Sequence, residues 1–227
     1  MRPMVVIGVP HHNGDIHVAL LKSLLGLRRS SFDMGFIESA NAEVATNRNI
    51  IAQKFLDHPS KPSHLFFVDS DMGIPADTVE KLLWADRSIV SGVAVQKFTN
   101  LWVSKNWGDL WDGMHTVQYD VCEKVPLTEA HWLIRPEFED KVLRIGATGG
   151  ACLLIKREVF ETVPYPWFYN EYRPGVTKHE TMGFMSEDIS FCYKADRYGH
   201  GTYLHTGVLC DHYIGTKKFP PFWEKKP

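Results

Sequence analysis

The sequence predicts an α/β protein whose central sheet is mostly parallel. Through the first hundred residues, short runs rich in Val, Ile and Phe alternate with stretches that are apolar at helical spacing. Strands that alternate with helices are typical of a sheet whose strands run in one direction. The chain has 227 residues, 44% of them hydrophobic, which suffices for one large domain or two tightly joined halves.

Four strands and three helices are expected in this first part of the chain. The strands span residues 4–10, 32–39, 64–68 and 88–95, and the helices span residues 16–27, 41–56 and 75–85. In the second helix, we expect Val44, Ile51 and Phe55 to face inward. In the third, we expect Pro75 at the helix start and Leu82 and Leu83 facing inward.

The second part of the chain is less regular. Residues 97–145 are expected to form loops and short strands, and they are rich in tryptophan: Trp102, Trp107, Trp111 and Trp132. A glycine-rich entry then precedes a strand at 151–155 and a helix that begins at Arg157. A helix opened by acids within 185–200, followed by a last strand ending at His212, completes the pattern.

Composition excludes several classes of function. The net charge is −2 with no basic stripe, so a nucleic-acid partner is not expected. No window supplies the roughly 18 apolar residues of a membrane span, and the apolar run at the N-terminus is too short for a signal peptide. Four cysteines without a CxxC pair are typical of reduced thiols: Cys122, Cys152, Cys192 and Cys210. These features predict a cytoplasmic protein.

Three strand ends are expected to meet at one edge of the sheet. Pro10, Glu38 and Asp69 close the first three strands, and ligands of open α/β sheets bind beyond such carboxyl ends. The third strand leads directly into Asp69-Ser70-Asp71, with no Lys or Arg within 64–75. Paired carboxylates suit a hard cation such as Mg²⁺ or Mn²⁺, which bridges to phosphates. The alternative is a solvated turn in which Asp71 helps to cap the next helix.

Acids and histidines later in the chain add to this pattern. Glu187 and Asp188 open a helix, where a carboxylate is stabilised and oriented for use as a general base. Plain helix capping is the alternative. His212 ends an apolar strand, although a lone histidine is usually a core or surface residue. His11 and His12 follow the first strand, from where one could face a ligand.

Taken in order, these segments resemble the GT-A glycosyltransferases, especially the inverting family 2 type and the small members encoded by phages and large viruses. The matching phrases are RNIIAQKFL, HLFFVDSDMGIPADTVEKLL, SIVSGVAVQKF, GATGGACLLIKREVFE, PWF and SEDISFCYKADRYGHGTYLHTGVLCDHYIG. The resemblance implies a GT-A fold with a Rossmann-like nucleotide-sugar-binding half at 1–96, an acceptor-binding and catalytic half at 97–215, and a tail at 216–227. For a phage- or virus-encoded member, it implies action in the host cytoplasm.

The resemblance also implies roles for the acids and for His212. Asp69-Ser70-Asp71 match the DXD motif, in which Asp71 would bind Mn²⁺ or Mg²⁺ directly and Asp69 would contact the ribose or reach the metal through water. His212 matches the late metal ligand. Glu187 and Asp188 match the ED motif, with Asp188 as catalytic base and Glu187 holding the acceptor.

Other residues would complete the donor and acceptor sites. The resemblance places Arg48 near the nucleotide or its diphosphate, and Pro10 and Glu38 near the base. Many family members carry Asp at the position of Glu38, so the base stays open. For the acceptor, we expect Trp167 to stack on a sugar, with core packing as the alternative. Two glycines, Gly149 and Gly150, are expected either to allow close backbone approach to a sugar or to form a turn.

The expected function is metal-dependent transfer of one sugar from a nucleotide-diphosphate sugar to a glycan or other hydroxyl acceptor, with inversion. The Q-x-x-R-W motif of processive synthases is absent from the sequence, which favours single-sugar transfer. Three alternatives stay open: a non-catalytic nucleotide- or carbohydrate-binding module, a sugar nucleotidyltransferase, and a metal-dependent hydrolase. The sequence does not indicate the donor sugar, the acceptor or the oligomeric state.

Overall fold

The computed structural model describes residues 2–12, 14–94, 122–124, 132–134, 138–173, 183–214, 217–219 and 221–223. Its helices are α1 (Val18–Leu25), α2 (Val44–Leu56), α3 (Thr78–Trp84), α6 (Arg157–Thr162) and α7 (Glu187–Arg197). Its strands are β1 (Met4–Pro10), β2 (Asp33–Ser39), β3 (His64–Val68), β4 (Met72–Gly73), β5 (Ile89–Ala94), β6 (Cys122–Lys124), β7 (Trp132–Ile134), β8 (Val142–Ile145), β9 (Cys152–Lys156), β10 (Glu171–Arg173), β11 (Gly183–Met185), β12 (Thr202–Ile214), β13 (Lys217–Phe219) and β14 (Pro221–Trp223).

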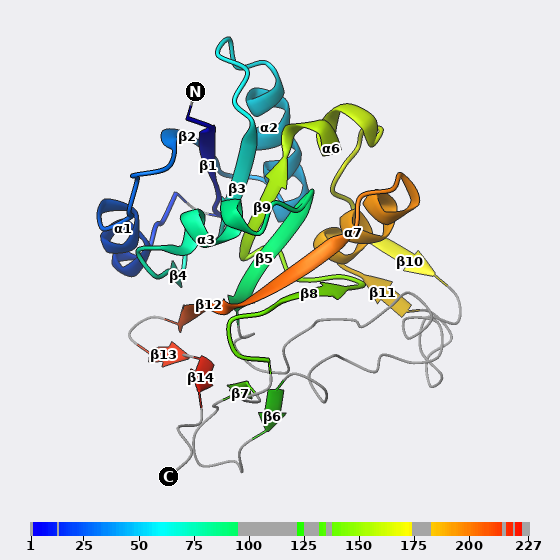
Figure 1. Cartoon of the computed structure of the whole chain (residues 1–227). Coiled ribbons are helices and arrows are strands. Elements are labelled where there is room, and N and C mark those ends of the chain that lie inside the picture. The colour runs from blue at the N-terminus through cyan, green and yellow to red at the C-terminus, as the bar shows by residue number, and fades with distance from the viewer. Residues whose placement is uncertain are drawn as a thin grey trace.

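The central sheet is mixed and mostly parallel (Figure 1). Its strand order is β13-β12-β5-β9-β3-β1-β2, with β4 and β8 paired to β12 outside this path. The strands β2, β1 and β3 run parallel, as do β5 and β12, whereas β9 runs antiparallel to both β3 and β5. The predicted fold class, an α/β protein built on a mixed, mostly parallel sheet with a Rossmann-like arrangement, is confirmed. The reversed direction of β9 was not predicted.

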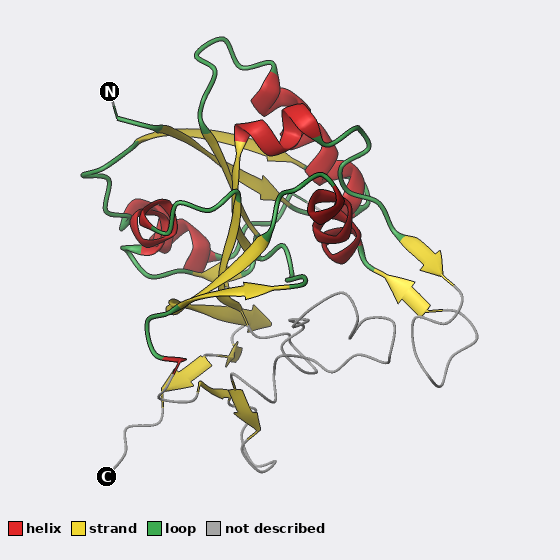
Figure 2. Ribbon diagram, turned by 45° about the vertical axis from the view of Figure 1, so that its right-hand side comes forward, coloured by secondary structure: helices red, strands yellow, loops and turns green. Residues whose placement is uncertain are grey.

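Helices cover both faces of the sheet because the strands are apolar on both sides (Figure 2). In β1, Val6 faces the cluster formed with α2, α6 and α7, while Val5 and Ile7 face the cluster formed with α1 and α3. The same alternation recurs in β3 and β9. Two separate cores therefore hold the sheet from its two sides and fix the positions of the strand ends.

The expected inward residues of the helices were mostly right. Ile51, Phe55 and Leu82 are fully buried, and Leu83 is partly buried against the same core as Leu82. The expectation for Val44 was wrong: it is 39% exposed, because it is the first residue of α2, where the helix emerges at the surface. The helix expected to start at Pro75 begins three residues later.

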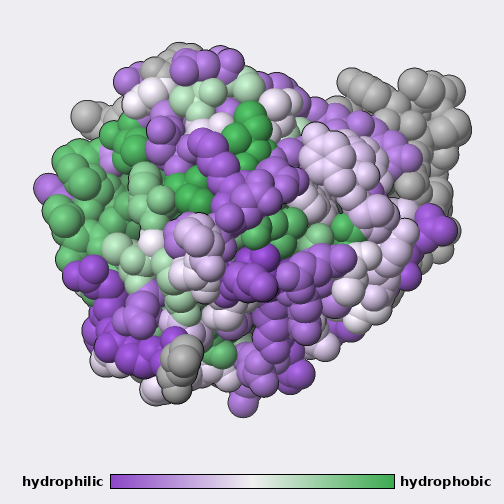
Figure 3. Space-filling view, turned by 90° about the horizontal axis from the view of Figure 1, so that it is seen from above, coloured by the Kyte–Doolittle hydropathy of each residue, from purple (hydrophilic) through white to green (hydrophobic). Residues whose placement is uncertain are grey.

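One surface of α1 is apolar. Val18, Leu21 and Leu25 are each more than half exposed, and Ile16, just before the helix, is 40% exposed. Figure 3, which views the molecule from above, shows apolar side chains gathered toward the side on which α1 lies in Figure 1. Within the part of the chain that the structure describes, no helix is long and apolar enough to cross a membrane.

The last residues of the chain differ from the expected tail. After β12, which was expected to be the last strand and continues past His212 to Ile214, come β13 and β14. β13 pairs with β12, and β14 pairs with β7 in a small three-stranded sheet. Trp102, Trp107 and Trp111 lie outside the described residues.

Candidate functional site

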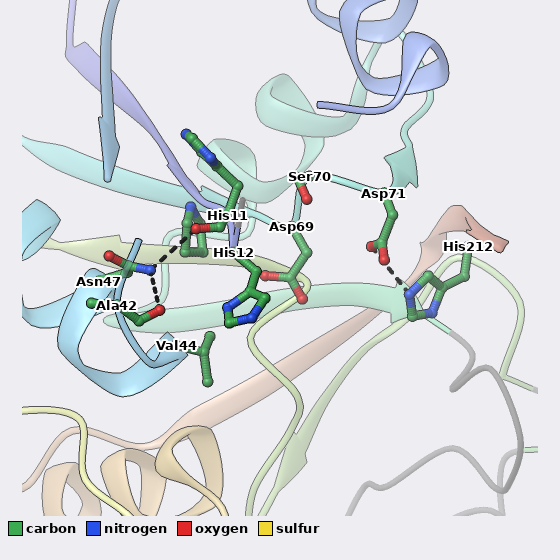
Figure 4. Close-up of a pocket in the computed structure, with 10 residues that line it drawn as sticks. His11, His12, Ala42, Val44, Asn47, Asp69, Ser70, Asp71 and His212 are labelled. Atoms are coloured by element: carbon green, nitrogen blue, oxygen red, sulfur yellow. Dashed lines mark hydrogen bonds and ion pairs between the residues drawn. The ribbon is translucent and has the colours of Figure 1, made fainter. Parts of the chain in front are cut away.

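A pocket of about 300 Å³ opens beyond the carboxyl ends of β1 and β3, at the edge of the sheet where the sequence predicted a ligand. Residues from the ends of β1, β3 and β12 and from the start of α2 line it (Figure 4). They are Pro10, His11, His12, Ala42, Val44, Asn47, Asp69, Ser70, Asp71 and His212. The structure thus gathers Pro10, the whole DXD segment and His212 around one cavity.

Asp71 and His212 point toward each other at one side of the pocket (Figure 4). Asp71 Oδ1 lies 3.2 Å from His212 Nε2, and both side chains are partly buried. The contact follows from strand pairing: β4 runs antiparallel to β12 with Met72 opposite His212, which brings the preceding Asp71 beside the imidazole. A carboxylate and an imidazole this close fit two positions around one divalent cation. Among the described residues, no group of three His, Cys, Asp or Glu side chains could hold a metal ion.

Asp69 points to a different partner. Its Oδ1 accepts a hydrogen bond of 2.8 Å from Arg48 Nη2. Arg48 is only 2% exposed, and it also donates to Glu187 Oε1 and to the carbonyl oxygen of Gly150, both at 3.2 Å. The guanidinium is therefore directed into the protein, where all three of its nitrogens donate to protein acceptors.

Asp188 is held by the residues around the start of its own helix and by the backbone of Gly150. Its Oδ2 accepts from the backbone N–H of Gly150 at 3.1 Å, and its Oδ1 accepts from the N–H of Ile189 at 2.8 Å and from the Ser186 hydroxyl. A Cβ at Gly149 would lie 3.6 Å from Asp188 Oδ2, an ordinary contact. These bonds orient the carboxylate at the N-terminus of α7.

Burial and neighbouring charges shift the pKa values of Glu187 and Arg48. Burial and the charge of Asp188 raise the pKa of Glu187 to about 7, against the opposing effect of Arg48. Burial alone would lower the pKa of Arg48, but the carboxylates of Asp69, Glu187 and Asp188 outweigh it and raise that pKa. Glu187 was expected to hold an acceptor, yet its side chain is 9% exposed and bonds to Arg48. The structure gives it an internal partner instead.

Glu38 and His11 form a pair beside the pocket. His11 Nε2 lies 2.6 Å from Glu38 Oε2, and His11 is buried while the Glu38 side chain is 52% exposed. Glu38 does not line the pocket itself. Asn47 in α2 holds both strand ends, because its amide N–H donates to the His11 carbonyl oxygen and its Oδ1 accepts from the Ser39 hydroxyl.

Three residues that line the pocket were not predicted from the sequence to do so, namely Ala42, Val44 and Asn47. The feature of the sequence that could have indicated them is Asn47, a polar residue on the face of α2 that is turned toward the protein; its side chain is buried, with the residue 1% exposed. A buried amide needs hydrogen-bond partners, and here the partners are the loops that form the pocket.

Trp167, which was expected either to stack on an acceptor sugar or to pack in the core, lies in the core. Trp167 is 4% exposed, and its indole N–H donates to the carbonyl oxygen of Val163 at 2.8 Å. Its ring packs edge-on against Phe160. Asn49 of α2 fixes this segment, since its Oδ1 accepts from the backbone N–H groups of Trp167 and Phe168. Core packing, the alternative reading, is the role that Trp167 has.

No protein family matches the chain, and no curated protein matches its sequence. Among solved structures, the crystal structure of A197 from STIV matches with a TM-score of 0.59 and 17% sequence identity, over 98% of this chain and 95% of that chain. The two chains share a fold. Weaker matches are S. aureus TarS 1-349 in complex with UDP (TM-score 0.45, 12% identity, 99% of this chain and 61% of that chain) and the inositol-1-phosphate CTP transferase from T. maritima (TM-score 0.43, 11% identity, 93% and 89%).

Proposed function

We propose that the protein is a metal-dependent glycosyltransferase that moves one sugar from a nucleotide-diphosphate sugar to an acceptor hydroxyl with inversion. The contact of 3.2 Å between Asp71 and His212 is the observation that carries the proposal. These two residues come from distant parts of the chain, and both line a pocket at the ligand-binding edge of the sheet. The pocket volume of about 300 Å³ lies at the lower end of the usual range for small-molecule sites.

The donor half of the proposed site is the pocket. Asp71 and His212 would hold Mn²⁺ or Mg²⁺, which when bound would stabilise negative charge on the departing diphosphate. Asp69, anchored by Arg48, keeps one carboxylate oxygen for the ribose or for a water beside the metal. The ends of β1 and β2, with Pro10 and the His11–Glu38 pair, lie where the base would sit.

The catalytic base in this proposal is Asp188. Its carboxylate would accept the proton of the acceptor hydroxyl while the acceptor oxygen attacks the anomeric carbon. As that bond forms, the bond from the anomeric carbon to the diphosphate oxygen breaks on the opposite face, and the nucleoside diphosphate leaves with the electron pair. A single displacement of this kind inverts the anomeric configuration. The backbone N–H groups of Gly150 and Ile189 hold the base in one orientation.

The proposal is tested by turnover of a panel of nucleotide sugars with Mn²⁺. Asp188→Asn should lower kcat by about a thousandfold, because the base is lost, while donor binding is retained. Asp33→Asn is the matched control: Asp33 lies at the start of β2 with its side chain 66% exposed, and its replacement should leave the rate unchanged.

The same assay separates the alternatives. Turnover by Asp188→Asn at the rate of the wild type would contradict the proposed mechanism. Saturable nucleotide binding without turnover of any donor would identify a non-catalytic binding module. Pyrophosphate release from a nucleoside triphosphate and a sugar phosphate would identify a nucleotidyltransferase, and donor breakdown that no acceptor accelerates would identify a hydrolase.

A further inference from the structure

Arg48 is the largest fully buried side chain among the described residues, and it joins three separate segments of the chain. From α2, its three guanidinium nitrogens donate to the carboxylate that follows β3, to the loop before β9 and to the start of α7. The acceptors are Asp69, Gly150 and Glu187, which lie 21, 102 and 139 residues away in sequence. Each nitrogen of the guanidinium therefore has a partner within the protein.

The surroundings keep this cation in one place. A buried guanidinium needs paired charges and hydrogen bonds, and the two carboxylates supply both. The ring of Phe67 lies 5.2 Å from the guanidinium carbon, on the side of the sheet. The planar fork of arginine can serve three acceptors in different directions, which the compact ammonium of lysine does less well.

Gly150 connects Arg48 to Asp188. Its carbonyl oxygen accepts from Arg48 Nη1, and its N–H donates to Asp188 Oδ2. The absence of a side chain is required here, because a Cβ at this position would lie 2.6 Å from both Cζ and Nη2 of Arg48. The glycine thus allows a close approach of the arginine, rather than of a ligand.

We propose that Arg48 is a positioning residue that fixes Asp69, at the donor pocket, and Asp188, the base, relative to each other. The inference rests on the proposed function for the roles of these two carboxylates. Arg48 acts on Asp69 directly and on Asp188 through Gly150. It is not a ligand of the diphosphate in this account. Since a misplacement of about 1 Å at a reacting group can lower a rate by about a hundredfold, the geometry of this link bears on kcat.

Arg157 offers a matched control. It also lies over a phenylalanine ring, with its guanidinium carbon 5.5 Å from the centre of Phe55, and it donates to the carbonyl oxygen of Leu56 at 2.8 Å. It ties α6 to the end of α2 and does not line the pocket. Arg157→Lys therefore perturbs a partly buried arginine without touching the proposed site.

The kinetic test compares Arg48→Lys with Arg157→Lys. Arg48→Lys should lower kcat by about a hundredfold with little change in the KM for the donor, whereas Arg157→Lys should change neither. A diphosphate ligand would behave differently. If Arg48→Lys weakens binding of the nucleoside diphosphate much more than binding of the corresponding nucleoside, the positioning role is overturned.

A second variant tests the same link without removing the arginine. Gly150→Ala should push the guanidinium aside and lower kcat in the same way, and its effect should not add to that of Arg48→Lys, because both break one network. Gly35→Ala, in β2, is its control, since a Cβ there would meet no charged group: its nearest atoms are the Cε of Met4 at 3.2 Å and the Cγ2 of Val6 at 3.3 Å. If Arg48→Lys does not fold, Gly150→Ala alone decides the test. A wild-type kcat in folded Gly150→Ala would overturn the inference.

A measurement on the free protein separates this inference from the proposed function. In Arg48→Lys, the amide N–H of residue 150 should change its chemical shift and exchange with solvent about tenfold faster, because its hydrogen bond to Asp188 loosens. Arg157→Lys should leave that amide unchanged. An unchanged Gly150 amide in Arg48→Lys would overturn the positioning role even in an active glycosyltransferase. A shifted amide in a protein that turns over no donor would support the link and contradict the function.

Discussion

At the scale of single residues, Glu187 is a buried carboxyl whose protonation should affect stability. Burial and Asp188 raise its folded-state pKa from 4.5 to about 7, so the folded state binds a proton that the unfolded state has released. The stabilising contribution is therefore complete below about pH 4.5 and is lost as the pH rises through about 7.

Glu187→Gln should remove this dependence, because glutamine does not titrate. Between pH 4.5 and 7.5, the free energy of unfolding of the wild type should fall relative to that of the variant, by at most about 3 kcal/mol. Urea unfolding of both proteins across this range measures the difference. The comparison of wild type with variant is necessary because His64 also titrates. Burial lowers the pKa of His64 to about 4, so its contribution to the free energy of unfolding rises with pH in both proteins. Parallel curves for the two proteins would contradict the raised pKa.

The partners of single residues were the least predictable part of the site. The sequence indicated that the DXD segment and His212 would meet, and Asp71 and His212 do so. It could not indicate that Arg48 would be buried, since its acceptors are brought to it only by the packing of α2 and α7. The core position of Trp167 could not be chosen from the sequence for a similar reason: a surface loop and a loop anchored by Asn49 look alike in sequence.

At the scale of elements, α2 organises the site. Its second half buries apolar side chains, including Ile51 and Phe55. Its first half buries three consecutive polar side chains, each of which holds a different segment. Asn47 holds the ends of β1 and β2, Arg48 holds the DXD segment and α7, and Asn49 holds the loop at 167–168.

Asn49→Ala should therefore lower stability more than an exposed helix substitution does. Asn49 accepts from two backbone N–H groups and donates to the Phe168 carbonyl oxygen, and its loss leaves these groups buried without partners. The free energy of unfolding should fall by about 2 kcal/mol or more. Chemical denaturation measures this, with Gln53→Ala as control, because Gln53 is exposed and bonds only to Asp57 within the described residues. Equal stabilities of the two variants would contradict the anchoring role.

Element types were easier to predict than their directions. Apolar runs between turn residues identified β1, β2, β3, β5, β9 and β12. The antiparallel direction of β9 could not be predicted, since it depends on the long segment that connects β5 to β9 and not on the strand itself. The strands β13 and β14 were missed because each has only three residues, too few to show the alternation that predicts a strand.

At the scale of the whole molecule, the fold brings segments from the first and the last part of the sequence to one edge of the sheet. The ends of β1 and β3 come from the first seventy residues, and β12 and α7 come from the last forty-one, residues 187 to 227. The pairing of β4 with β12 joins them at the pocket. We propose that this junction holds a divalent cation together with the diphosphate of a nucleotide.

The most direct test is the thermal stability of the protein with UDP, GDP, CDP and dTDP, each with and without Mn²⁺. One nucleotide at a hundred times its Kd should raise the free energy of unfolding by about 2.7 kcal/mol, and only when Mn²⁺ is present. Asp71→Ala and His212→Ala should each abolish this gain. A nucleotide effect that needs no Mn²⁺, or that is the same in the wild type and in both variants, would contradict the account.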